Sequence, residues 1–323
     1  MSTKTYLVTG GSGFVGRALI RQLAASADHW VVAPVRHLQP SVAPRVRQVA
    51  WSGLGGGQDL TEALQGVDCV IHAAARVHVM NEAAADPLAA FRQVNVEGTL
   101  DLARQAMAAG VRRFIFVSSI KVNGEETVPG RVYTADDLPA PVDPYGISKH
   151  EAEQALLALA AGTGMDVVII RPVLVYGPGV KANFLSMMRW LDRGVPLPFG
   201  AVDNRRSLVA LDNLVDLVLT CAEHPAAANQ IFLASDGDDV STTRLLRLLG
   251  AALGKPARLL PVPVALMSGA ARMLGRTALS QRLFGSLQVD ISKNQQLLNW
   301  VPPVTLDRAL QLTAQHFLDT RQT

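Results

Sequence analysis

Short apolar runs alternate with amphipathic stretches through the first half of the chain. The runs are largely unbroken by polar residues, which is typical of strands buried on both faces of a parallel sheet. Between them, apolar residues recur at helical spacing, as at Phe14, Val15, Ala18, Leu19 and Leu23. The pattern predicts strands at 5–10, 30–35, 45–51, 68–75, 113–119 and 165–172, and helices at 14–25, 61–64, 87–109 and 147–161.

This alternation predicts an α/β fold with a Rossmann-type, doubly wound parallel sheet. The second half is less regular, and proline-rich turns separate helices expected near 183–193, 212–223, 241–252 and 305–318. Strand-like pieces at 207–211 and 230–234 are expected to return to the main sheet. We therefore predict a Rossmann domain over residues 1–172, to which later segments near 207–235 return. A smaller C-terminal lobe over residues 173–323 is expected to close over the sheet and bind substrate.

Composition narrows the class of protein. Hydrophobic residues make up 49% of the 323 residues and aromatic residues 5%, which suits a large aliphatic core. The net charge is +3, and no dense block of Lys or Arg is present, which argues against nucleic-acid binding. Cys69 and Cys221 lie far apart and form neither a disulfide framework nor a metal-binding pattern. A reducing compartment and the absence of a bound metal are therefore expected.

Targeting and membrane segments are not expected. Residues 1–20 carry glycines and charges where a signal peptide would have an apolar core. No uninterrupted apolar run reaches the roughly 18 residues that a membrane span needs, so we expect a cytoplasmic protein. The stretch 261–287 is apolar but broken by Pro, Gly and Arg. We expect it to pack on the protein, with an amphipathic helix on a membrane surface as the alternative.

The first strand leads into the glycine-rich segment TGGSGFVG at residues 9–16, which is followed by a helix. Gly10 permits a tight turn, Gly13 lets the backbone approach a pyrophosphate, and Gly16 lets the helix pack closely. The helix start offers free N–H groups and a positive dipole to phosphate. We predict that these glycines, with Phe14 and Val15 at the helix start, bind a dinucleotide.

The end of the second strand indicates which dinucleotide is bound. An acidic residue at this point would bind the adenosine ribose hydroxyls and favour NAD. The chain instead has Ala33-Pro34-Val35-Arg36-His37 and no acid. A guanidinium can grip a 2′-phosphate in a two-pronged contact. We therefore expect NADP(H), with NAD(H) as the alternative if Arg36 is only a surface residue.

A candidate catalytic group follows in the sequence. Tyr145 and Lys149 are four residues apart, which places them on one face at the start of a helix. The Lys149 ammonium is expected to lower the pKa of the Tyr145 phenol and to bind the nicotinamide ribose. Ser119 ends the strand RFIFVSS, at the sheet edge where ligands of parallel sheets bind, and can donate a hydrogen bond to the reacting oxygen.

With these motifs the chain resembles the extended short-chain dehydrogenases/reductases of the NAD-dependent epimerase/dehydratase family. The matching segments are 9–16, 59–60, 72–75, 117–119, 145–149 and 171–179, together with Asn95. The resemblance implies that Asn95 kinks its helix rather than taking part in chemistry. It further implies contacts to the cofactor from Asp59 and Leu60 at the adenine, from Ala73 and Ala74 after the fourth strand, and from Pro172 and Val173 at the nicotinamide.

The second half resembles the nucleotide-sugar members of this family. The resemblance implies that Asn183 and Arg206 bind the sugar diphosphate and that Phe199, within 197–200, lies near a uracil. Guanidinium groups suit a diphosphate, and Arg205 and Arg206 provide two. A second phosphate clamp is assigned to Arg282. The resemblance continues at residues 291–300.

Residues after Ser119 separate the reactions known in the family. Ile120 and Lys121 stand where dehydratases have Asp-Glu, so elimination of water would lack its general acid and base. Lys121 and Asn123 stand where epimerases usually have Ser or Thr and Tyr, and Lys121 is assigned to substrate binding. Together with Arg36, these departures favour an NADP(H)-dependent reductase of a UDP-linked 4-keto sugar. Similar bacterial proteins act in O-antigen and capsule sugar pathways.

Two alternatives stay open. The first is a UDP-glucose or UDP-N-acetylhexosamine 4-epimerase, which holds NAD and consumes none. The second is a cofactor-binding regulator without turnover, although such proteins typically lack the Tyr or the Lys. The resemblance also implies a homodimer joined through helices 87–109 and 147–161 as a four-helix bundle.

Overall fold

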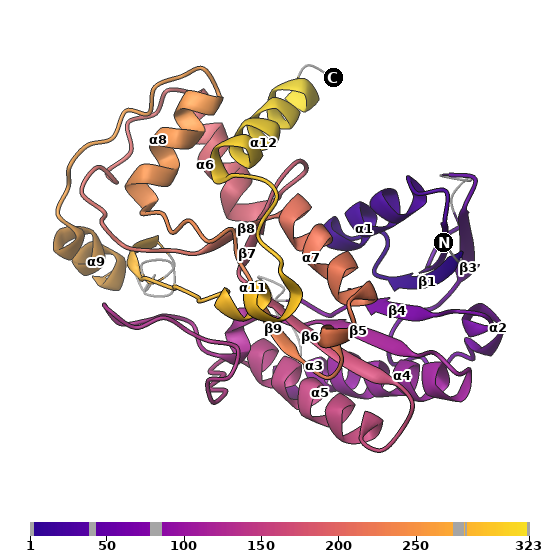
Figure 1. The fold of residues 1–323 in the computed structure, drawn as a ribbon. Helices are drawn as coiled ribbons and strands as arrows, with labels where there is room; N and C mark the ends of the chain where they lie inside the picture. The colour runs from indigo at the N-terminus through magenta and orange to yellow at the C-terminus, as the bar shows by residue number, and fades with distance from the viewer. Residues whose placement is uncertain (1–2, 39–42, 78–85, 274–280, 282, 322–323) are drawn as a thin grey trace.

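The computed structural model describes residues 3–38, 43–77, 86–273, 281 and 283–321. Its centre is a seven-stranded sheet in the order β3-β2-β1-β4-β5-β6-β9, in which every neighbouring pair is parallel (Figure 1). The predicted doubly wound Rossmann sheet is confirmed. The strands are β1 (Lys4–Thr9), β2 (His29–Val35), β3 (Val46–Ala50), β4 (Cys69–His72), β5 (Arg113–Val117), β6 (Asp166–Pro172) and β9 (Ile231–Ala234).

Helices cover both faces of this sheet (Figure 1). On β1, Val8 joins one buried cluster with Leu19 and Leu214. The next side chain, Leu7, joins the other cluster with Leu102. Burial on both faces explains why the strands are continuous apolar runs in the sequence. One face carries α1 (Phe14–Ala24) and α7 (Leu211–Glu223), and the other carries α2 (Thr61–Leu64), α3 (Pro87–Arg92), α4 (Gly98–Ala108) and α5 (Pro144–Ala160).

The helix expected over 87–109 is interrupted by a π-helical turn, η1 (Gln93–Glu97), between α3 and α4. Asn95 lies in this turn and is 1% exposed. Its amide donates to the Arg76 carbonyl and to Ser148 Oγ, each at 3.0 Å, and accepts from the Arg76 N–H at 2.8 Å. Asn95 thus lies in a π-helical interruption between α3 and α4 and links it to Ser148, on the helix that carries Tyr145.

Two strand predictions need correction. β4 ends at His72, not at residue 75, because the chain leaves the sheet where it meets the glycine turn. The piece expected at 207–211 does not return to the main sheet. Instead, β8 (Leu208–Ala210) pairs with β7 (Leu174–Tyr176) in a separate two-stranded sheet. The piece at 230–234 does return, as β9 beside β6.

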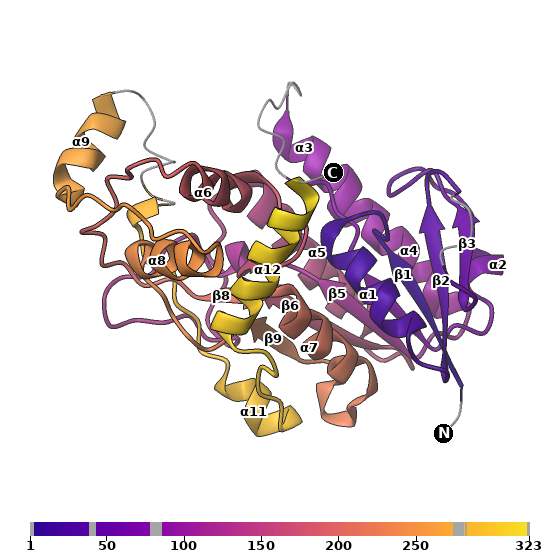
Figure 2. The ribbon, with the colours of Figure 1, turned by 90° about the horizontal axis from the view of Figure 1, so that it is seen from above.

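The C-terminal lobe lies to one side of the sheet (Figures 1 and 2). Three helices there share a buried cluster: α6 (Ala182–Asp192), α8 (Thr242–Ala252) and α12 (Leu306–Arg321). α11 (Ser292–Leu298) packs near β9. The domain division near residue 172 stays a prediction.

The apolar stretch 261–287 contains α9 (Val264–Met273), which was expected to pack on the protein. None of its side chains is fully buried, but Val264 and Met267 are half-buried, so packing of this stretch on the protein stays a prediction. Leu266 is 66% and Met273 90% exposed. Within the described ranges, the helices lack the length or the apolar character needed to cross a bilayer.

Candidate active site

The β1–α1 turn forms a backbone cradle. Gly10 has a φ of 73°, and a Cβ there would lie 2.8 Å from the Ala74 nitrogen. The Gly13 N–H donates to the Gly10 carbonyl at 2.8 Å, and a Cβ on Gly16 would lie 2.2 Å from that carbonyl oxygen. Each of these close approaches requires glycine. The turn is therefore pressed against Ala73 and Ala74, and its N–H groups at the start of α1 can face a pyrophosphate.

A buried histidine network holds the two strands below this cradle together. Thr9 Oγ1 lies 2.7 Å from His72 Nδ1, and His72 Nε2 lies 2.9 Å from Thr99 Oγ1. The Ala74 N–H donates to Thr9 Oγ1 at 3.2 Å. Burial, and then the charge of Lys149, lower the pKa of His72 to about 3, so the ring stays neutral. Sequence reasoning missed this network, for which the segment HAAA was the only signal.

Tyr145 and Lys149 lie on the first turns of α5. The helix begins earlier than expected because Asp143 caps it, accepting from the Gly146 N–H at 2.6 Å, and Pro144 follows at the first position. The Lys149 side chain is 1% exposed, and its Nζ lies 3.8 Å from the centroid of the Phe116 ring. Burial lowers the pKa of Lys149 to about 7, which Glu153 partly offsets.

Ser119 lies two residues after the end of β5, at the start of a short turn that packs on α5. Its Oγ accepts from the Lys121 N–H at 3.3 Å and so caps the 3₁₀ turn η2 (Ile120–Val122). This turn packs against α5. The Ser119 segment and the helix start with Tyr145 therefore meet at the carboxyl edge of the sheet, as the sequence predicted.

The pKa of Tyr145 departs from the expectation. Burial, and then the charge of Asp143, raise it to about 12, rather than lowering it as expected from Lys149 alone. The ring also packs edge-on against Phe91, with centroids 6.0 Å apart, which contributes to its desolvation. In this environment the phenol is protonated at neutral pH and can donate a proton.

One buried polar atom at this edge lacks a hydrogen-bond partner within the part of the chain that the structure describes. Ser118 is 3% exposed, and its Oγ has no hydrogen-bond partner among the described residues. A buried hydroxyl left unpaired is costly, so a polar ligand atom is the natural partner. Together with the glycine cradle and Lys149, this orphaned hydroxyl shows that the residues present fit a dinucleotide laid across the carboxyl ends of the strands.

The other predicted cofactor residues lie along the same edge. Arg36 is exposed directly after β2. Asp59 is exposed, and its hydrogen bonds with Thr61 lower its pKa. Leu60 is 2% exposed, so its side chain belongs to the core. The remaining two, Pro172 at the end of β6 and Val173 after it, are buried.

The predicted substrate residues are more scattered. Asn183 is exposed on the first turn of α6, and Phe199 packs 6.2 Å from the Phe284 ring. The Arg206 guanidinium donates to the Gly285 carbonyl at 3.1 Å. Phe199 and Arg206 are thus brought to the same segment of the C-terminal lobe. Arg282 lies outside the described residues. Lys121 forms ion pairs with Glu125 and Asp143, two acids that the sequence did not identify as its partners.

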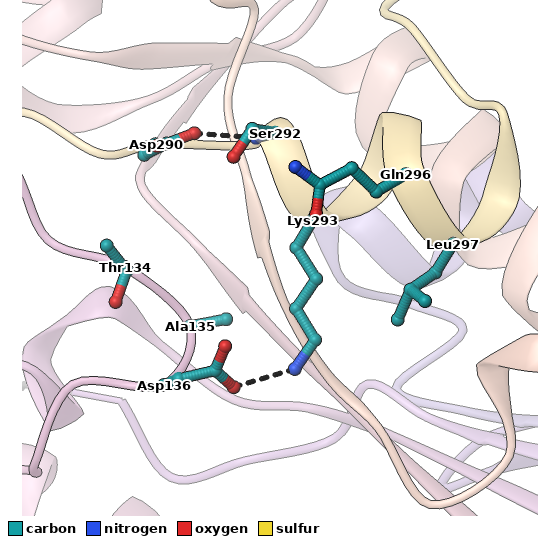
Figure 3. A pocket seen from close by; sticks show the side chains of 8 residues that line it. All are labelled: Thr134, Ala135, Asp136, Asp290, Ser292, Lys293, Gln296 and Leu297. Atoms are coloured by element: carbon teal, nitrogen blue, oxygen red, sulfur yellow. Dashed lines mark hydrogen bonds and ion pairs between the residues drawn. The ribbon is translucent and has the colours of Figure 1, made fainter.

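A hollow of about 340 Å³ lies elsewhere, between the loop after η2 and α11 (Figure 3). Lys293 of α11 reaches across it to Asp136 at 2.8 Å. None of the predicted site residues lines this hollow, so it carries no part of the assignment. Its lining consists of Thr134, Ala135, Asp136, Asp290, Ser292, Lys293, Gln296 and Leu297.

Comparison with known proteins agrees with this geometry. The NAD dependent epimerase/dehydratase family matches residues 6–234. The chain belongs to this family. It is 48% identical over 316 residues to a UDP-glucose 4-epimerase of Vibrio cholerae, covering 98% of this chain and 96% of that protein. It is 29% identical to a GDP-6-deoxy-D-mannose reductase of Pseudomonas aeruginosa, covering 96% and 95%.

The fold is shared with solved members. The crystal structure of a UDP-glucose 4-epimerase with UDP-glucose from Thermotoga maritima matches with a TM-score of 0.78 and 24% identity, covering 98% of this chain and 99% of that one. The predicted class, an NAD(P)-dependent short-chain oxidoreductase or epimerase, is therefore confirmed.

Substituting Gly16 tests the cradle. Gly16→Ala places a methyl group 2.2 Å from the Gly10 carbonyl oxygen, so the turn must shift. We expect a loss of about 1–3 kcal/mol in unfolding free energy and weaker dinucleotide binding. Urea unfolding and fluorescence titration with NADH and NADPH measure the two effects. Gly164→Ala is the control, because its Cβ would meet nothing within 4 Å, and equal behaviour of both variants would contradict the assignment.

Proposed function

We propose that the protein is a 4-epimerase of a UDP-linked hexose of the UDP-glucose type. The observation that carries this proposal is the 48% identity, over nearly the full length, to the Vibrio cholerae UDP-glucose 4-epimerase. The arrangement of Ser119, Tyr145 and Lys149 at the carboxyl edge of the sheet supports it, because inversion at a secondary alcohol needs one group that both takes and returns a proton.

A bound nicotinamide would supply reversible hydride transfer. In this proposal the glycine cradle at Gly10 and Gly13 holds the pyrophosphate, and Lys149 binds the ribose hydroxyls. In its phenolate form Tyr145 takes the proton of the C4 hydroxyl as the alcohol becomes a ketone, and Ser119 hydrogen-bonds the same oxygen. Tyr145 then returns the proton after the opposite face of the ketone has been reduced, which inverts C4.

A reductase of a UDP-linked 4-keto sugar, the function favoured by the sequence alone, becomes the second candidate. Three observations favour it. Arg36 stands at the end of β2 without an acid, which suits NADP(H). The high pKa of Tyr145, about 12, keeps the phenol protonated and ready to donate. The third observation is Asn123, which stands where epimerases usually carry Tyr. Its side chain is 1% exposed and accepts a hydrogen bond from Arg171.

Two measurements on the purified protein separate these functions. Mass spectrometry of the small molecules released by denaturation identifies a retained dinucleotide. Interconversion of UDP-glucose or UDP-N-acetylglucosamine with its C4 epimer, with NAD retained, supports the epimerase. Stoichiometric loss of NADPH absorbance with UDP-4-keto-6-deoxy-N-acetylglucosamine, without epimerisation, overturns the epimerase in favour of the reductase.

Cofactor preference gives a further prediction. Arg36→Ala should raise the KM for NADPH about tenfold to hundredfold if the guanidinium binds the 2′-phosphate, and should leave the KM for NADH unchanged. Steady-state kinetics with both dinucleotides measure this difference. Arg45→Ala serves as the control, because Arg45 precedes β3 at the opposite edge of the sheet. An equal rise in the KM for NADH and NADPH in Arg36→Ala would show that Arg36 does not bind the 2′-phosphate.

The role in surface polysaccharide synthesis and the homodimer through α3–α4 and α5 stay predictions. Gel filtration with light scattering tests the dimer, and a monomer at micromolar concentration would contradict it.

A further inference from the structure

A lysine foreign to the family pattern connects the two catalytic segments. The Lys121 ammonium makes an ion pair with Asp143 and a second with Glu125, whose Oε1 lies 2.8 Å away. The three side chains are only partly buried, with exposed fractions of 27%, 21% and 35% for Lys121, Asp143 and Glu125. We call these three residues the clasp.

Each end of the clasp belongs to a catalytic segment. Lys121 is two residues after Ser119, and its backbone N–H donates to Ser119 Oγ. Asp143 uses its other carboxylate oxygen to cap α5, two residues before Tyr145. The Lys121–Asp143 ion pair therefore joins the turn that carries Ser119 to the helix start that carries Tyr145.

Backbone contact at the same point makes the clasp close-fitting. A Cβ on Gly146 would lie 2.8 Å from the Lys121 carbonyl oxygen, so only glycine allows η2 and α5 to come this near. The Ala140 N–H donates to the Val122 carbonyl at 2.9 Å and holds the far side of the turn. The ion pair therefore lies directly beside the point where the backbones of the two segments touch.

The clasp also sets the charge next to the phenol. Asp143 is the acid whose charge raises the pKa of Tyr145, and Lys121 neutralises it. On the same helix, Lys149 points to the Phe116 ring, and Glu125, after the turn, pairs with Lys121. From α3, Phe91 packs on the Tyr145 ring, and the Arg76 guanidinium lies over Phe91.

We propose that Lys121 is a positioning residue that holds Ser119 and Tyr145 at their working separation and compensates the charge of Asp143. Its ammonium is occupied by the two acids, so it acts on the reaction through Asp143 and not by gripping the sugar. The proposal rests on the proposed roles of Ser119 and Tyr145 in proton transfer. It does not depend on the choice between epimerase and reductase, since both need that transfer.

Two substitutions break the clasp from opposite sides. Lys121→Met leaves Asp143 uncompensated, and Asp143→Asn removes the negative charge while keeping a helix cap. Both should lower kcat about tenfold to hundredfold with a KM for the sugar nucleotide within about twofold of wild type, because the catalytic groups are displaced. Lys121→Arg should restore most of kcat, since a guanidinium can pair with both acids.

The pH profile supplies a readout that a merely structural role would not produce. An uncompensated carboxylate disfavours the phenolate, so Lys121→Met should move the Tyr145 limb of the kcat profile to higher pH. Asp143→Asn removes that carboxylate and should move the same limb to lower pH. Lys293→Met is the control, because the Lys293–Asp136 pair also links distant segments but lines a hollow to which neither Ser119 nor Tyr145 contributes, and it should leave kcat, KM and the profile unchanged.

The outcomes separate this proposal from others. A raised KM for the sugar nucleotide with unchanged kcat in Lys121→Met would overturn it and assign Lys121 to substrate contact. Limbs that move in the same direction, or not at all, would also overturn it. If Lys121→Met fails to fold, Asp143→Asn and Lys121→Arg decide the question alone.

If the wild type catalyses neither reaction, the proposed function fails independently of the clasp. The titration of Tyr145 is then followed by phenolate ultraviolet absorbance, as the difference between each variant and the same variant carrying Tyr145→Phe. Opposite shifts in Lys121→Met and Asp143→Asn would support the clasp, and shifts in one direction would overturn it.

Discussion

Tyr145→Phe is expected to lower kcat by about 10³-fold while the protein stays folded and binds its dinucleotide. The substitution removes only the phenolic oxygen. The ring keeps its edge-on contact with Phe91, and the Asp143 cap on α5 is untouched. The variant therefore lacks the proton donor and acceptor without a packing defect, and kcat should fall in either the epimerase or the reductase reaction.

Single-turnover and steady-state kinetics measure this loss, and circular dichroism checks the fold. Tyr133→Phe is the matched control, because its hydroxyl donates only to the Glu126 carbonyl at 2.7 Å, outside the catalytic segments. We expect it to keep wild-type kcat. Turnover that survives in Tyr145→Phe would remove the basis of the proposed mechanism.

Arg171→Met is expected to reduce the unfolding free energy by about 3–5 kcal/mol. Arg171 and Glu153 are each 2% exposed and form a two-pronged ion pair, with Nε–Oε1 at 2.9 Å and Nη2–Oε2 at 2.6 Å. The third arm of the guanidinium donates to Asn123 at 3.0 Å. Removing the guanidinium leaves a carboxylate buried without a partner, which costs far more than the ion pair itself contributes.

Urea unfolding measures this effect, with Arg92→Met as the control. Arg92 of α3 pairs at 2.6 Å with Glu151, which is on α5 like Glu153, but the two side chains are 48% and 30% exposed. We expect a loss of about 0–1 kcal/mol there, because water solvates the remaining partner. The double variant Arg171→Met with Glu153→Met should recover part of the loss. Similar losses in Arg171→Met and Arg92→Met would show that Glu153 is not left buried without a partner.

The fold was predictable because its signals are local. The strands of the first half lie within a few residues of the predicted limits, since unbroken apolar runs need burial on both faces. The helix α5 began earlier than predicted, although Asp143-Pro144 is a recognisable cap and first position. The strand piece at 207–211 was misplaced because three apolar residues fit either sheet, and only pairing with β7 decided which.

The candidate site was predictable in part. The glycine turn and the spacing of Tyr145 and Lys149 each lie within a short stretch of sequence, so both could be recognised from the sequence. The histidine network joins residues 9, 72 and 99, and the clasp joins residues 121, 125 and 143. Such contacts depend on which segments pack side by side, which no single stretch of sequence states.

The sequence by itself determined the Rossmann sheet and the place of the glycine turn, and it supplied Ser119, Tyr145 and Lys149 as the candidates for proton transfer. Only the tertiary structure decided the electrostatic state of those groups. Burial raises the pKa of Tyr145 and lowers that of Lys149, and the Asp143 charge that acts on Tyr145 is paired with Lys121 from another segment. The reason is physical: residue spacing sets which side chains share a helix face, whereas desolvation and the nearest charges are set by neighbours from other parts of the chain.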